Sequence, residues 1–391
     1  MKSVLYIGVG VPWQGGAGYL VRQNMLLKAL AECAHLHLAM FDCEPDLATV
    51  PPFVKAITPL HTPIRSELSR MHRLLNDLFS PLPRMHQGYA LKQTRAKVRS
   101  LNLAQFEAIF AYRIDFARFA GVERNPRLIL DIDDPEHLRR ANGLKVLQGH
   151  DVNWRTRLDL YKLKRFECNI ARQAQATFIC QEHDAASFTP HTPIIIPNCI
   201  DVPDQIHRYE NKSPTLLFIG NMSGGPLSPN GDAVKWFLCH IWPRIYQRVP
   251  NCKFQLVGRM SEPLQRLIQD EPNVEALGFV DALVDVYANS WLSIAPIRYG
   301  TGTRIKILES LAYGCPVVST PKGCEGIAVK DNINILMSNS EADFANACVS
   351  LIQDEQKRHR LGQAGRQLIA NHYNRHRQHH VLVDELTRVL S

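Results

Sequence analysis

Short apolar runs alternate with longer segments of helical periodicity along the first half of the chain. The runs lie at residues 3–9, 35–41, 108–112, 127–132 and 177–180. A continuous apolar run of this length is typical of a strand buried on both faces, and the segments between most of the runs carry the spacing of helices. The Pro-rich segment at 46–100 is also expected to be mostly helical. Strands alternating with helices predict a parallel sheet.

The same alternation starts again after a polar, non-periodic segment at residues 201–214. Predicted strands follow at 215–220, 253–257, 274–278, 291–295 and 315–319, with helical segments between them. The pattern predicts an α/β protein with two Rossmann-like domains, each a doubly wound parallel sheet. We expect a first domain at 1–200, a hinge at 201–214 and a second domain at 215–374. Ligands of such sheets bind beyond the carboxyl ends of the strands, so we expect the site in a cleft between facing domains.

The stretch at residues 296–326 carries the clearest sign of chemistry. It leaves an apolar run, passes through the turn Gly300-Thr301-Gly302 and enters a short amphipathic helix at 304–313, which Gly314 ends. The first turn of a helix presents unpaired backbone N–H groups at the positive end of the dipole, and such a turn binds anions. Arg304 and Lys306 add two cations at the same end. This placement is unfavourable unless a multiply charged anion binds there.

Lys306 and Glu309 are three residues apart and therefore share one face of this helix. The lysine can hold a phosphate while the carboxylate accepts hydrogen bonds from sugar hydroxyls. We therefore predict a site for a nucleotide diphosphate. The alternative is a surface helix with an ordinary ion pair between the two residues.

A second glycine-rich turn, Gly15-Gly16-Ala17-Gly18, follows the first apolar run. A dinucleotide fingerprint starting at Gly8 would need a third glycine where Trp13 stands, so the glycine pattern does not favour that interpretation. The other interpretation is a loop whose backbone closes over a substrate held by the second domain. Gly15 and Gly16 are then candidate site residues.

The composition is that of a soluble globular protein, with 45% hydrophobic and 21% charged residues among 391. Its ten cysteines form no C-x-x-C pair and no zinc spacing, so we expect inert thiols in a reduced, cytosolic protein. The first residues read as a strand rather than a signal peptide. No apolar run approaches the ~20 residues that a membrane span needs.

The net charge of +8 is unevenly spread, and much of the excess lies between Arg65 and Arg99. The basic residues there alternate with Leu, Phe and Met at helical spacing. This surface could lie on an anionic membrane or face an anionic acceptor, and a solvated helical face is the third alternative. No DNA- or RNA-binding motif accompanies the charge, so we expect no nucleic-acid partner.

Several motifs occur together. They are the N-terminal Gly-Gly-x-Gly, I-P-N-C-I-D at 196–201, P-N-x-D-A-V-x-W-F at 229–237, V-G-R at 257–259, G-T-G-T-R-I-K-I-L-E-S-L-A-Y-G-C-P-V-V-S-T at 300–320 and E-G-I at 325–327. With this set the chain resembles the GT-B-fold glycosyltransferases of family 4, the retaining and metal-independent group 1 transferases. The forms at 229–237 and 304–309 look most like the branch that builds bacterial surface polysaccharides.

The resemblance implies a role for each matching residue. The implied donor site consists of Gly16, Thr301, Gly302, Thr303, Arg304, Lys306 and Glu309. Glu309 would bind the ribose, the residues at 302–306 would hold the diphosphate, and Gly16 would close over it from the first domain. The last helix, residues 375–391, would pack back onto the first domain.

Two departures from the family pattern concern the donor. The first of the family's paired glutamates falls on Thr301, which puts contacts to the transferred sugar in doubt. The Arg and Lys that commonly follow the first strand of the second domain are absent after Gly220, where Asn221-Met222-Ser223 stand. Arg304 and Lys306 would then carry more of the phosphate charge.

A third departure lies on the acceptor side. Many relatives place a His-Asp pair at the end of a first-domain strand, and the matching residues here are Asp133 and Asp134. A carboxylate at this place could orient the acceptor hydroxyl or accept its proton. Asp131 and Asp133 also mimic a D-x-D metal site, and helix-capping aspartates are a further alternative.

We therefore expect a glycosyltransferase that uses a nucleotide diphosphate sugar as donor and a glycan or lipid-linked glycan as acceptor, with Arg304, Lys306 and Asp133 as catalytic residues. No cofactor and no metal are expected, and the chain is expected in the cytoplasm, with peripheral contact at the inner face of the membrane. A nucleotide-sugar epimerase and a non-catalytic GT-B scaffold are the alternatives.

Overall fold

The structure is a computed structural model that describes residues 2–14, 18–44, 49–146, 153–206, 213–226, 228–280, 282–300 and 304–391. The chain divides into two compact units. The first comprises Met1–Pro197 and Gln378–Ser391, and the second comprises Asn198–Arg377. The boundary falls between Pro197 and Asn198, ahead of the polar segment at 201–214.

The first unit contains a seven-stranded sheet in which all neighbouring strands are parallel. Its order is β3-β2-β1-β4-β5-β6-β7. The strands are β1 (Lys2–Val9), β2 (Ala34–Phe41), β3 (Val54–Leu60), β4 (Ala108–Tyr112), β5 (Leu128–Asp133), β6 (Ala176–Ile179) and β7 (Ile194–Ile195). The reversal of order at β1 is typical of a doubly wound sheet.

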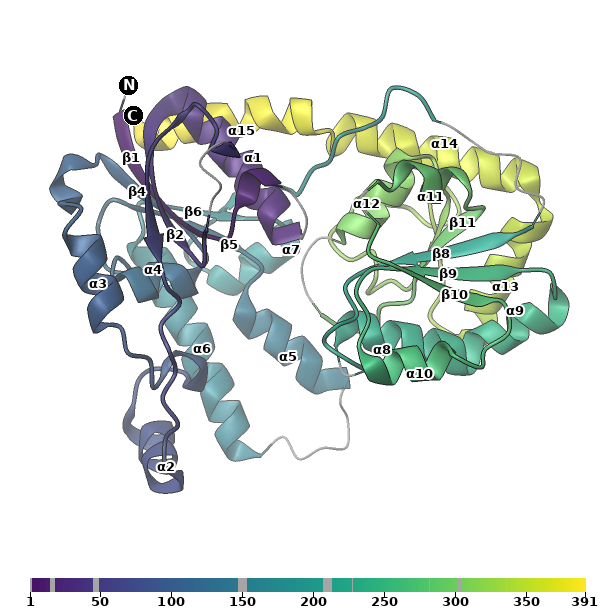
Figure 1. Ribbon diagram of the computed structural model, residues 1–391, viewed down its shortest axis with the longest axis horizontal. Coiled ribbons are helices and arrows are strands. Elements are labelled where there is room, and N and C mark those ends of the chain that lie inside the picture. Colours follow the sequence, from purple (N-terminus) through teal and green to yellow (C-terminus); the bar gives the residue numbers. More distant parts are fainter. Residues whose placement is uncertain are drawn as a thin grey trace. The chain divides into compact units, whose positions relative to one another are not determined.

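Helices accompany this sheet (Figure 1). They are α1 (Gly18–Cys33), α2 (Arg70–Phe79), α3 (Lys92–Arg99), α4 (Ile114–Ala120), α5 (Glu136–Val146), α6 (Trp154–Gln173), α7 (Glu182–Ala185) and α15 (Arg375–Leu390). Short 3-10 turns occur at Pro12–Gln14, Arg84–His86, Leu103–Gln105 and Ala186–Phe188. One core cluster joins alternate residues of β1, β4 and β5 to α4 and α6, because side chains of a strand alternate between its two faces.

The expectation that residues 46–100 are mostly helical is wrong in part. Residues Val54–Leu60 form β3, which pairs with β2 at the edge of the sheet. Pro59 lies inside this strand. An edge strand tolerates a proline because one row of its backbone groups has no neighbouring strand to pair with.

The last helix, α15, lies against the first unit over its C-terminal part. The ammonium group of Lys2 contacts the carbonyl oxygen of Leu390. Gln175 Nε2 donates a 2.8 Å hydrogen bond to the carbonyl oxygen of Val389. The buried side chains of Leu382 and Leu386 add apolar contact. Residues from opposite ends of the chain therefore complete one unit.

The second unit contains a six-stranded parallel sheet in the order β10-β9-β8-β11-β12-β13. The strands are β8 (Thr215–Ile219), β9 (Lys253–Val257), β10 (Val274–Gly278), β11 (Leu292–Ala295), β12 (Val317–Ser319) and β13 (Leu336–Met337). The helices are α8 (Pro229–Trp236), α9 (Trp242–Arg248), α10 (Glu262–Ile268), α11 (Val284–Ala288), α12 (Ile305–Ala312), α13 (Glu341–Gln353) and α14 (Glu355–His372). A π-helical turn at Phe237–Ile241 joins α8 to α9.

Neighbouring residues of β8 face opposite layers of this unit. Leu216 and Phe218 pack with α8, α9 and α13, whereas Leu217 packs with α11. Figure 1 shows helices on both faces of the sheet. The buried central strands β8 and β11 explain why the sequence is mostly apolar at these positions. Gly314, with φ +66°, ends α12 as expected.

The prediction of two doubly wound parallel sheets is confirmed for each unit. Within the described ranges, no helix combines the length and the apolar character of a bilayer-spanning segment. A cleft between facing domains stays a prediction.

Candidate functional site

The predicted cationic helix and the P-N-G-D segment meet at the carboxyl end of β8. Lys306 Nζ, on α12, donates a 2.7 Å hydrogen bond to Asn230 Oδ1, on the first turn of α8. The same ammonium group lies 4.1 Å from the centre of the Phe218 ring, at a distance typical of a cation–π contact. Ser228 caps α8 by accepting a hydrogen bond from the backbone N–H of Gly231. The cap holds the turn that carries Asn230 in place.

Two glycines permit this close approach. A Cβ atom at Gly220, the residue after β8, would lie 2.8 Å from Lys306 Nζ. Gly258 follows β9 with φ +125°, and a Cβ atom there would lie 2.1 Å from the carbonyl oxygen of Gly220. Both positions therefore need glycine, because any side chain would displace backbone or the lysine.

The environment of Lys306 lowers the pKa of its ammonium group. Burial lowers the pKa of Lys306 to about 7, and the positive charge of Arg304 lowers it further, while Glu309 acts in the opposite direction. A half-buried ammonium beside another cation is unfavourable until an anion arrives. A shifted lysine of this kind is characteristic of a binding or catalytic site.

Glu309 is one turn further along α12. Burial raises the pKa of its carboxyl to about 7, and the charge of Lys306 partly offsets this rise. Among the residues that the structure describes, no ion pair joins Lys306 to Glu309. The alternative of an exposed helix held by such a pair is therefore not borne out. Each group retains hydrogen-bonding capacity for a ligand.

A cavity of about 380 Å³ adjoins this part of the second unit. It is lined by Pro203, Asp204, Gln205, Val284, Tyr287, Ala288 and Tyr313. The rings of Tyr287 and Tyr313 stack at 4.7 Å between centres. Burial raises the pKa of Tyr287, and the charge of Glu309 raises it further.

An ion pair that was not predicted from the sequence joins Arg298 to α8. Arg298 Nη2 lies 2.5 Å from Asp232 Oδ1, and its guanidinium stacks on Trp236 with 5.4 Å to the ring centre. The motif P-N-x-D-A-V-x-W-F contains Asp232 and Trp236 of this arrangement, and also Asn230, which contacts Lys306. Its polar residues Asn230 and Asp232 contact Lys306 of α12 and Arg298, respectively. The motif is the feature of the sequence from which this ion pair could have been predicted.

Several predicted site residues lie outside the described residues, namely Gly15, Gly16, Thr301, Gly302 and Thr303. Their roles stay predictions. Arg304 is described and occupies the N-terminal cap position of α12, where its carbonyl oxygen accepts a 2.8 Å hydrogen bond from the backbone N–H of Ile307.

In the first unit, Asp133 ends β5 in a strained conformation. Its φ of +59° is unusual for a residue other than glycine, and the register between β5 and β6 shifts between Asp131 and Asp133. Tyr112 donates a 2.8 Å hydrogen bond to Asp133 Oδ2, and Arg113 Nη2 lies 3.4 Å from the same oxygen. Bulges and strained residues concentrate at functional sites. Burial raises the pKa of Tyr112 well above its usual value, and the charge of Asp133 raises it further, so the phenol stays a donor.

The D-x-D metal alternative is wrong for Asp131. Its two carboxylate oxygens accept hydrogen bonds from Arg22, at 2.8 and 2.6 Å, and both side chains are buried. A fully buried carboxylate with an arginine on both oxygens is not open to a cation. Asp133, half-buried Asp134 and Cys180 do hold oxygen and sulfur atoms within 4.8 Å of one another. Among described residues these three are the group that could hold a metal ion.

Comparisons with known proteins identify a similar family over the second unit and similar folds over the whole chain. Residues 213–354 match the family model described as glycosyl transferases group 1. The "uncharacterized 44.6 kDa protein in cps region" of Klebsiella pneumoniae is 23% identical over 181 residues. That match spans 44% of this chain and 44% of the relative, so less than half of either length is covered.

Solved structures share the fold over the whole chain. HepE of Anabaena, in complex with UDP and glucose, has a TM-score of 0.64 at 15% identity, covering 99% of this chain and 100% of that one. Sucrose-phosphate synthase of Thermosynechococcus elongatus has a TM-score of 0.73 at 14% identity, covering 100% and 99%. WaaG, a glycosyltransferase involved in lipopolysaccharide biosynthesis, has a TM-score of 0.65 at 14% identity and covers 99% of each chain. The chain therefore has the GT-B fold, and its residues 213–354 are similar to the group 1 glycosyl transferases.

Proposed function

We infer that this protein is a retaining, metal-independent glycosyltransferase that moves a sugar from a nucleotide diphosphate sugar to a hydroxyl of a glycan or lipid-linked glycan. The observation that carries this inference is the placement of Lys306 on Asn230, with Glu309 one turn further along the same helix. A cation and a carboxylate at that spacing suit a diphosphate and a ribose. HepE, which shares the fold, has been solved with UDP and glucose.

The cationic end of α12 would stabilise the leaving diphosphate. In the free protein Lys306 has a pKa of about 7. A diphosphate beside it raises that pKa, so the lysine takes up a proton as the donor binds. Charge that develops on the leaving group during transfer then meets Arg304, Lys306 and the first N–H groups of α12. Preorganised electrostatic stabilisation of this kind is usually the largest contribution to catalysis.

The acceptor would be oriented by the first unit. Asp133 is held by Tyr112 and Arg113, and its carboxylate can accept a hydrogen bond from an acceptor hydroxyl. No protein nucleophile is assigned. As the family resemblance implies, the hydroxyl would attack from the face that the diphosphate leaves, and a diphosphate oxygen would take the hydroxyl proton.

The setting of the reaction is also part of the proposal. A relative from a cps region and the surface-polysaccharide forms of the motifs support a role in polysaccharide or glycoconjugate biosynthesis. The reaction would take place in the cytoplasm, with peripheral contact at the inner face of the membrane, where a lipid-linked acceptor is within reach.

The test uses the full chain with a panel of nucleotide diphosphate sugars and a pool of lipid-linked and free oligosaccharides, with products detected by mass spectrometry. We expect transfer with one donor, unchanged by a chelator, and a product whose anomeric configuration matches that of the donor by NMR. Conversion of the donor without an acceptor would instead identify an epimerase. Absence of both transfer and nucleotide binding would identify a scaffold and overturn the proposal.

A further inference from the structure

Helix α2 of the first unit buries part of its polar face and exposes its apolar face. Asp77 is buried, at 6% exposure. Met71, Leu74, Leu75 and Leu78 are 72%, 41%, 46% and 46% exposed. These four occupy positions i, i+3, i+4 and i+7 and therefore form one stripe. A helix of a globular protein ordinarily turns such a stripe toward the core.

Ion pairs, rather than apolar packing, hold α2 in this orientation. Arg84 contacts both carboxylate oxygens of Asp77, at 2.6 and 2.7 Å. Arg155 of α6 lies 2.6 Å from Asp77 Oδ2, and Lys162 donates a 2.5 Å hydrogen bond to the carbonyl oxygen of Asp77. Hydrogen bonding to Arg84 lowers the pKa of Asp77, so the carboxylate stays charged. The ion pairs at Asp77 therefore fix the orientation of α2, and this orientation exposes the apolar stripe.

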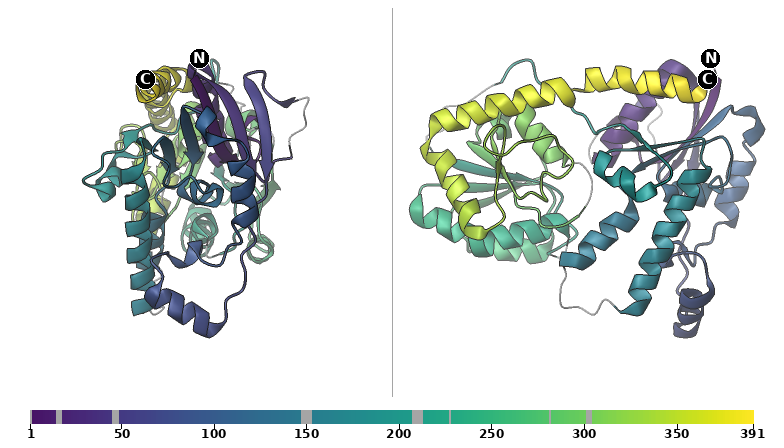
Figure 2. Two further views of the ribbon diagram at one scale, coloured as in Figure 1. Left: turned by 90° about the vertical axis from the view of Figure 1, so that its left-hand side faces the viewer. Right: turned by 180° about the vertical axis from the view of Figure 1, so that it is seen from behind.

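The apolar exposure is concentrated here. Among the described residues, the large exposed hydrophobic side chains include five on α2, the fifth being Phe79 at 79%. Ile64 precedes the helix at 81% exposure, and α6 beside it exposes Trp154 and Tyr161. Figure 2 shows α2 next to the N-terminal half of α6. A contiguous exposed apolar patch is characteristic of an interaction surface.

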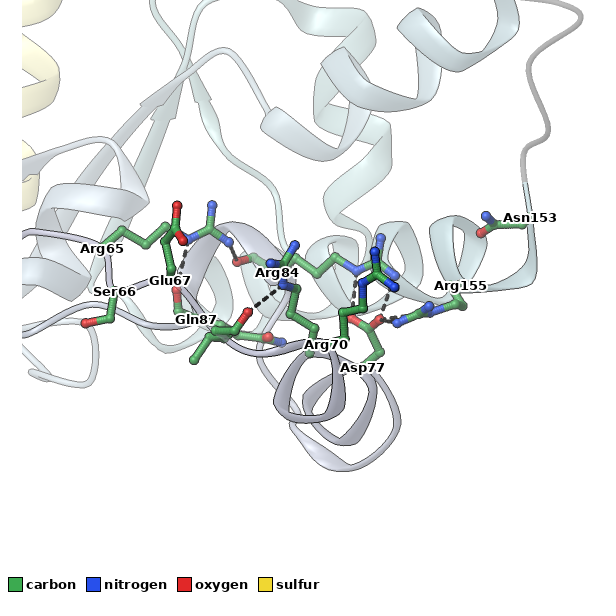
Figure 3. Close-up of a pocket in the computed structure, with 11 residues that line it drawn as sticks. Arg65, Ser66, Glu67, Arg70, Asp77, Arg84, Gln87, Asn153 and Arg155 are labelled. Carbon is green, nitrogen blue, oxygen red and sulfur yellow. Dashed lines mark hydrogen bonds and ion pairs between the residues drawn. The ribbon is translucent and has the colours of Figure 1, made fainter.

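A cavity of about 700 Å³ adjoins the polar face of α2 (Figure 3). Its charged lining consists of Arg65, Arg70, Arg73, Arg84 and Arg155 against Glu67 and Asp77. Asp77 is already paired with two of these arginines. The cavity therefore has an excess of positive charge.

In the described part of the chain, no carboxylate lies at ion-pair distance from the other three arginines of the cavity, Arg65, Arg70 and Arg73. Arg65 donates to the carbonyl oxygens of Arg84 and Gln87, at 2.7 and 3.2 Å. Arg73 donates to the carbonyl oxygen of Leu68 at 2.7 Å. Their guanidinium charges are available to an external anion, and guanidinium groups bind phosphate in a bidentate manner.

We propose that α2 and this arginine cavity form a membrane-docking face that binds an anionic bilayer. The apolar stripe enters the interface between headgroups and acyl chains, and the cavity receives headgroup phosphates. Exposed aliphatic residues beside basic ones, with Trp and Tyr nearby, match the chemistry of that interface. A nucleic acid or a phosphopeptide would pair with the arginines but would leave the leucine stripe uncovered.

The sequence places much of the excess positive charge at residues 65–99, and the structure assigns only part of this stretch to the docking face. Its C-terminal part, α3, contributes no residue to the lining of this cavity. Arg95 of α3 is paired with Glu123 at 3.1 Å and donates to the carbonyl oxygen of Arg118. The docking face is therefore α2 with the segment leading into it and the start of α6.

The test is co-sedimentation of the full chain with vesicles of phosphatidylcholine alone and of equal parts phosphatidylcholine and phosphatidylglycerol. We expect binding to the anionic vesicles only. Arg70→Glu changes the charge by two, so at about fivefold per charge we expect a loss of roughly 25-fold. Leu75→Asp should lower binding by about tenfold or more, because an apolar contact is replaced by a charge.

Matched controls separate this face from general charge and hydrophobicity. Arg99→Glu, at an exposed position of α3, and Ile333→Asp, at an exposed position of the second unit, should bind nearly as the parent does apart from the small effect of net charge. All four substituted side chains are exposed, so thermal unfolding should stay unchanged. Vesicle binding requires no sugar transfer, and its result is independent of the proposed enzymatic function.

Two results would overturn the proposal. One is equal binding of the parent chain to both kinds of vesicle, or none to either. The other is binding that Arg99→Glu and Ile333→Asp weaken as much as Arg70→Glu and Leu75→Asp do. Inorganic pyrophosphate is added as a separate arm. A stabilisation of the parent chain that Arg70→Glu abolishes, together with no vesicle binding, would identify the cavity as a site for a soluble phosphate compound instead.

Discussion

The ammonium group of Lys306 donates a 2.7 Å hydrogen bond to the side-chain oxygen of Asn230, a residue 76 positions earlier in the chain. The first helix of the second unit thereby fixes the position of a cation on a helix that the chain forms much later. The hydrogen bond and the Phe218 ring support the ammonium group without neutralising it. Its charge is left for a ligand.

Replacing this lysine should improve stability and remove function. Because the pKa of Lys306 lies at about 7 in the folded protein and near 10.5 in the unfolded chain, the unfolded chain binds more protons between these values. Stability attributable to this group therefore rises with pH across that window, and the penalty is complete below pH 7. We expect Lys306→Met to raise the free energy of unfolding at neutral pH by about 1–2 kcal/mol.

The same variant should lower turnover by roughly 10²–10³-fold, a range typical for loss of one group that stabilises developing charge. Denaturant unfolding and initial rates measure the two effects. Lys235→Met, at an exposed position of α8, is the matched control and should change neither. Unchanged rates in Lys306→Met would remove the residue from the catalytic assignment.

Nucleotide binding should depend on pH with a maximum near 7. Diphosphate contact requires protonated Lys306, and hydrogen bonding from ribose hydroxyls requires ionised Glu309, and both pKa values are about 7 in the free protein. Affinity should fall by up to about tenfold per pH unit on each side of the maximum. Isothermal titration across pH measures the profile. Glu309→Gln should remove the acidic limb and Lys306→Met the alkaline limb, whereas a profile independent of pH would contradict both assignments.

Asn230 should act by positioning Lys306. Asn230→Leu removes the acceptor of the 2.7 Å hydrogen bond and should weaken nucleotide binding about five- to tenfold, in line with the net value of a hydrogen bond to a charged group. Asn230→Asp provides a distinguishing comparison. Its carboxylate stabilises the ammonium form, so the alkaline limb should move to higher pH. Identical pH profiles in all three proteins would argue against a positioning role.

The acceptor side should be separable from the donor side. Tyr112→Phe removes the 2.8 Å hydrogen bond to Asp133, and we expect kcat/KM for the acceptor to fall about tenfold while nucleotide affinity stays unchanged. Tyr6→Phe is the control, because Tyr6 is another buried tyrosine of the same sheet that hydrogen-bonds to Gln23. Loss of nucleotide affinity in Tyr112→Phe would mean that the residue acts on the fold of the unit.

Arg22 should be a stability residue. Arg22→Met leaves the buried carboxylate of Asp131 without its bidentate partner, and such a loss destabilises a protein by about 3–5 kcal/mol. The double variant Arg22→Met, Asp131→Leu should recover much of that loss, because no charge is then buried alone. Equal destabilisation in the single and double variants would show that packing, not charge, is responsible.

The order of strands and helices could be predicted from the sequence because the central strands of both sheets are buried on both faces. The run Ala108–Tyr112, for example, is continuously apolar and buried at every position. The exposed edge strand Val54–Leu60 was missed, because its accessible, Pro-containing sequence lacks that pattern. The helix of Arg304, Lys306 and Glu309 was predicted from local spacing alone, since all three lie within two turns.

Only the tertiary structure decided which partners these residues meet. Asn230 reaches Lys306, Asp232 reaches Arg298 and Arg22 reaches Asp131 across 66 to 109 residues of chain. No local periodicity encodes a distance of that kind. The same holds for α2, whose apolar spacing predicts an amphipathic helix but not the direction of its faces. The sequence by itself determined the elements and the cationic turn, because these depend on neighbours along the chain, and folding determined the environment of each charge.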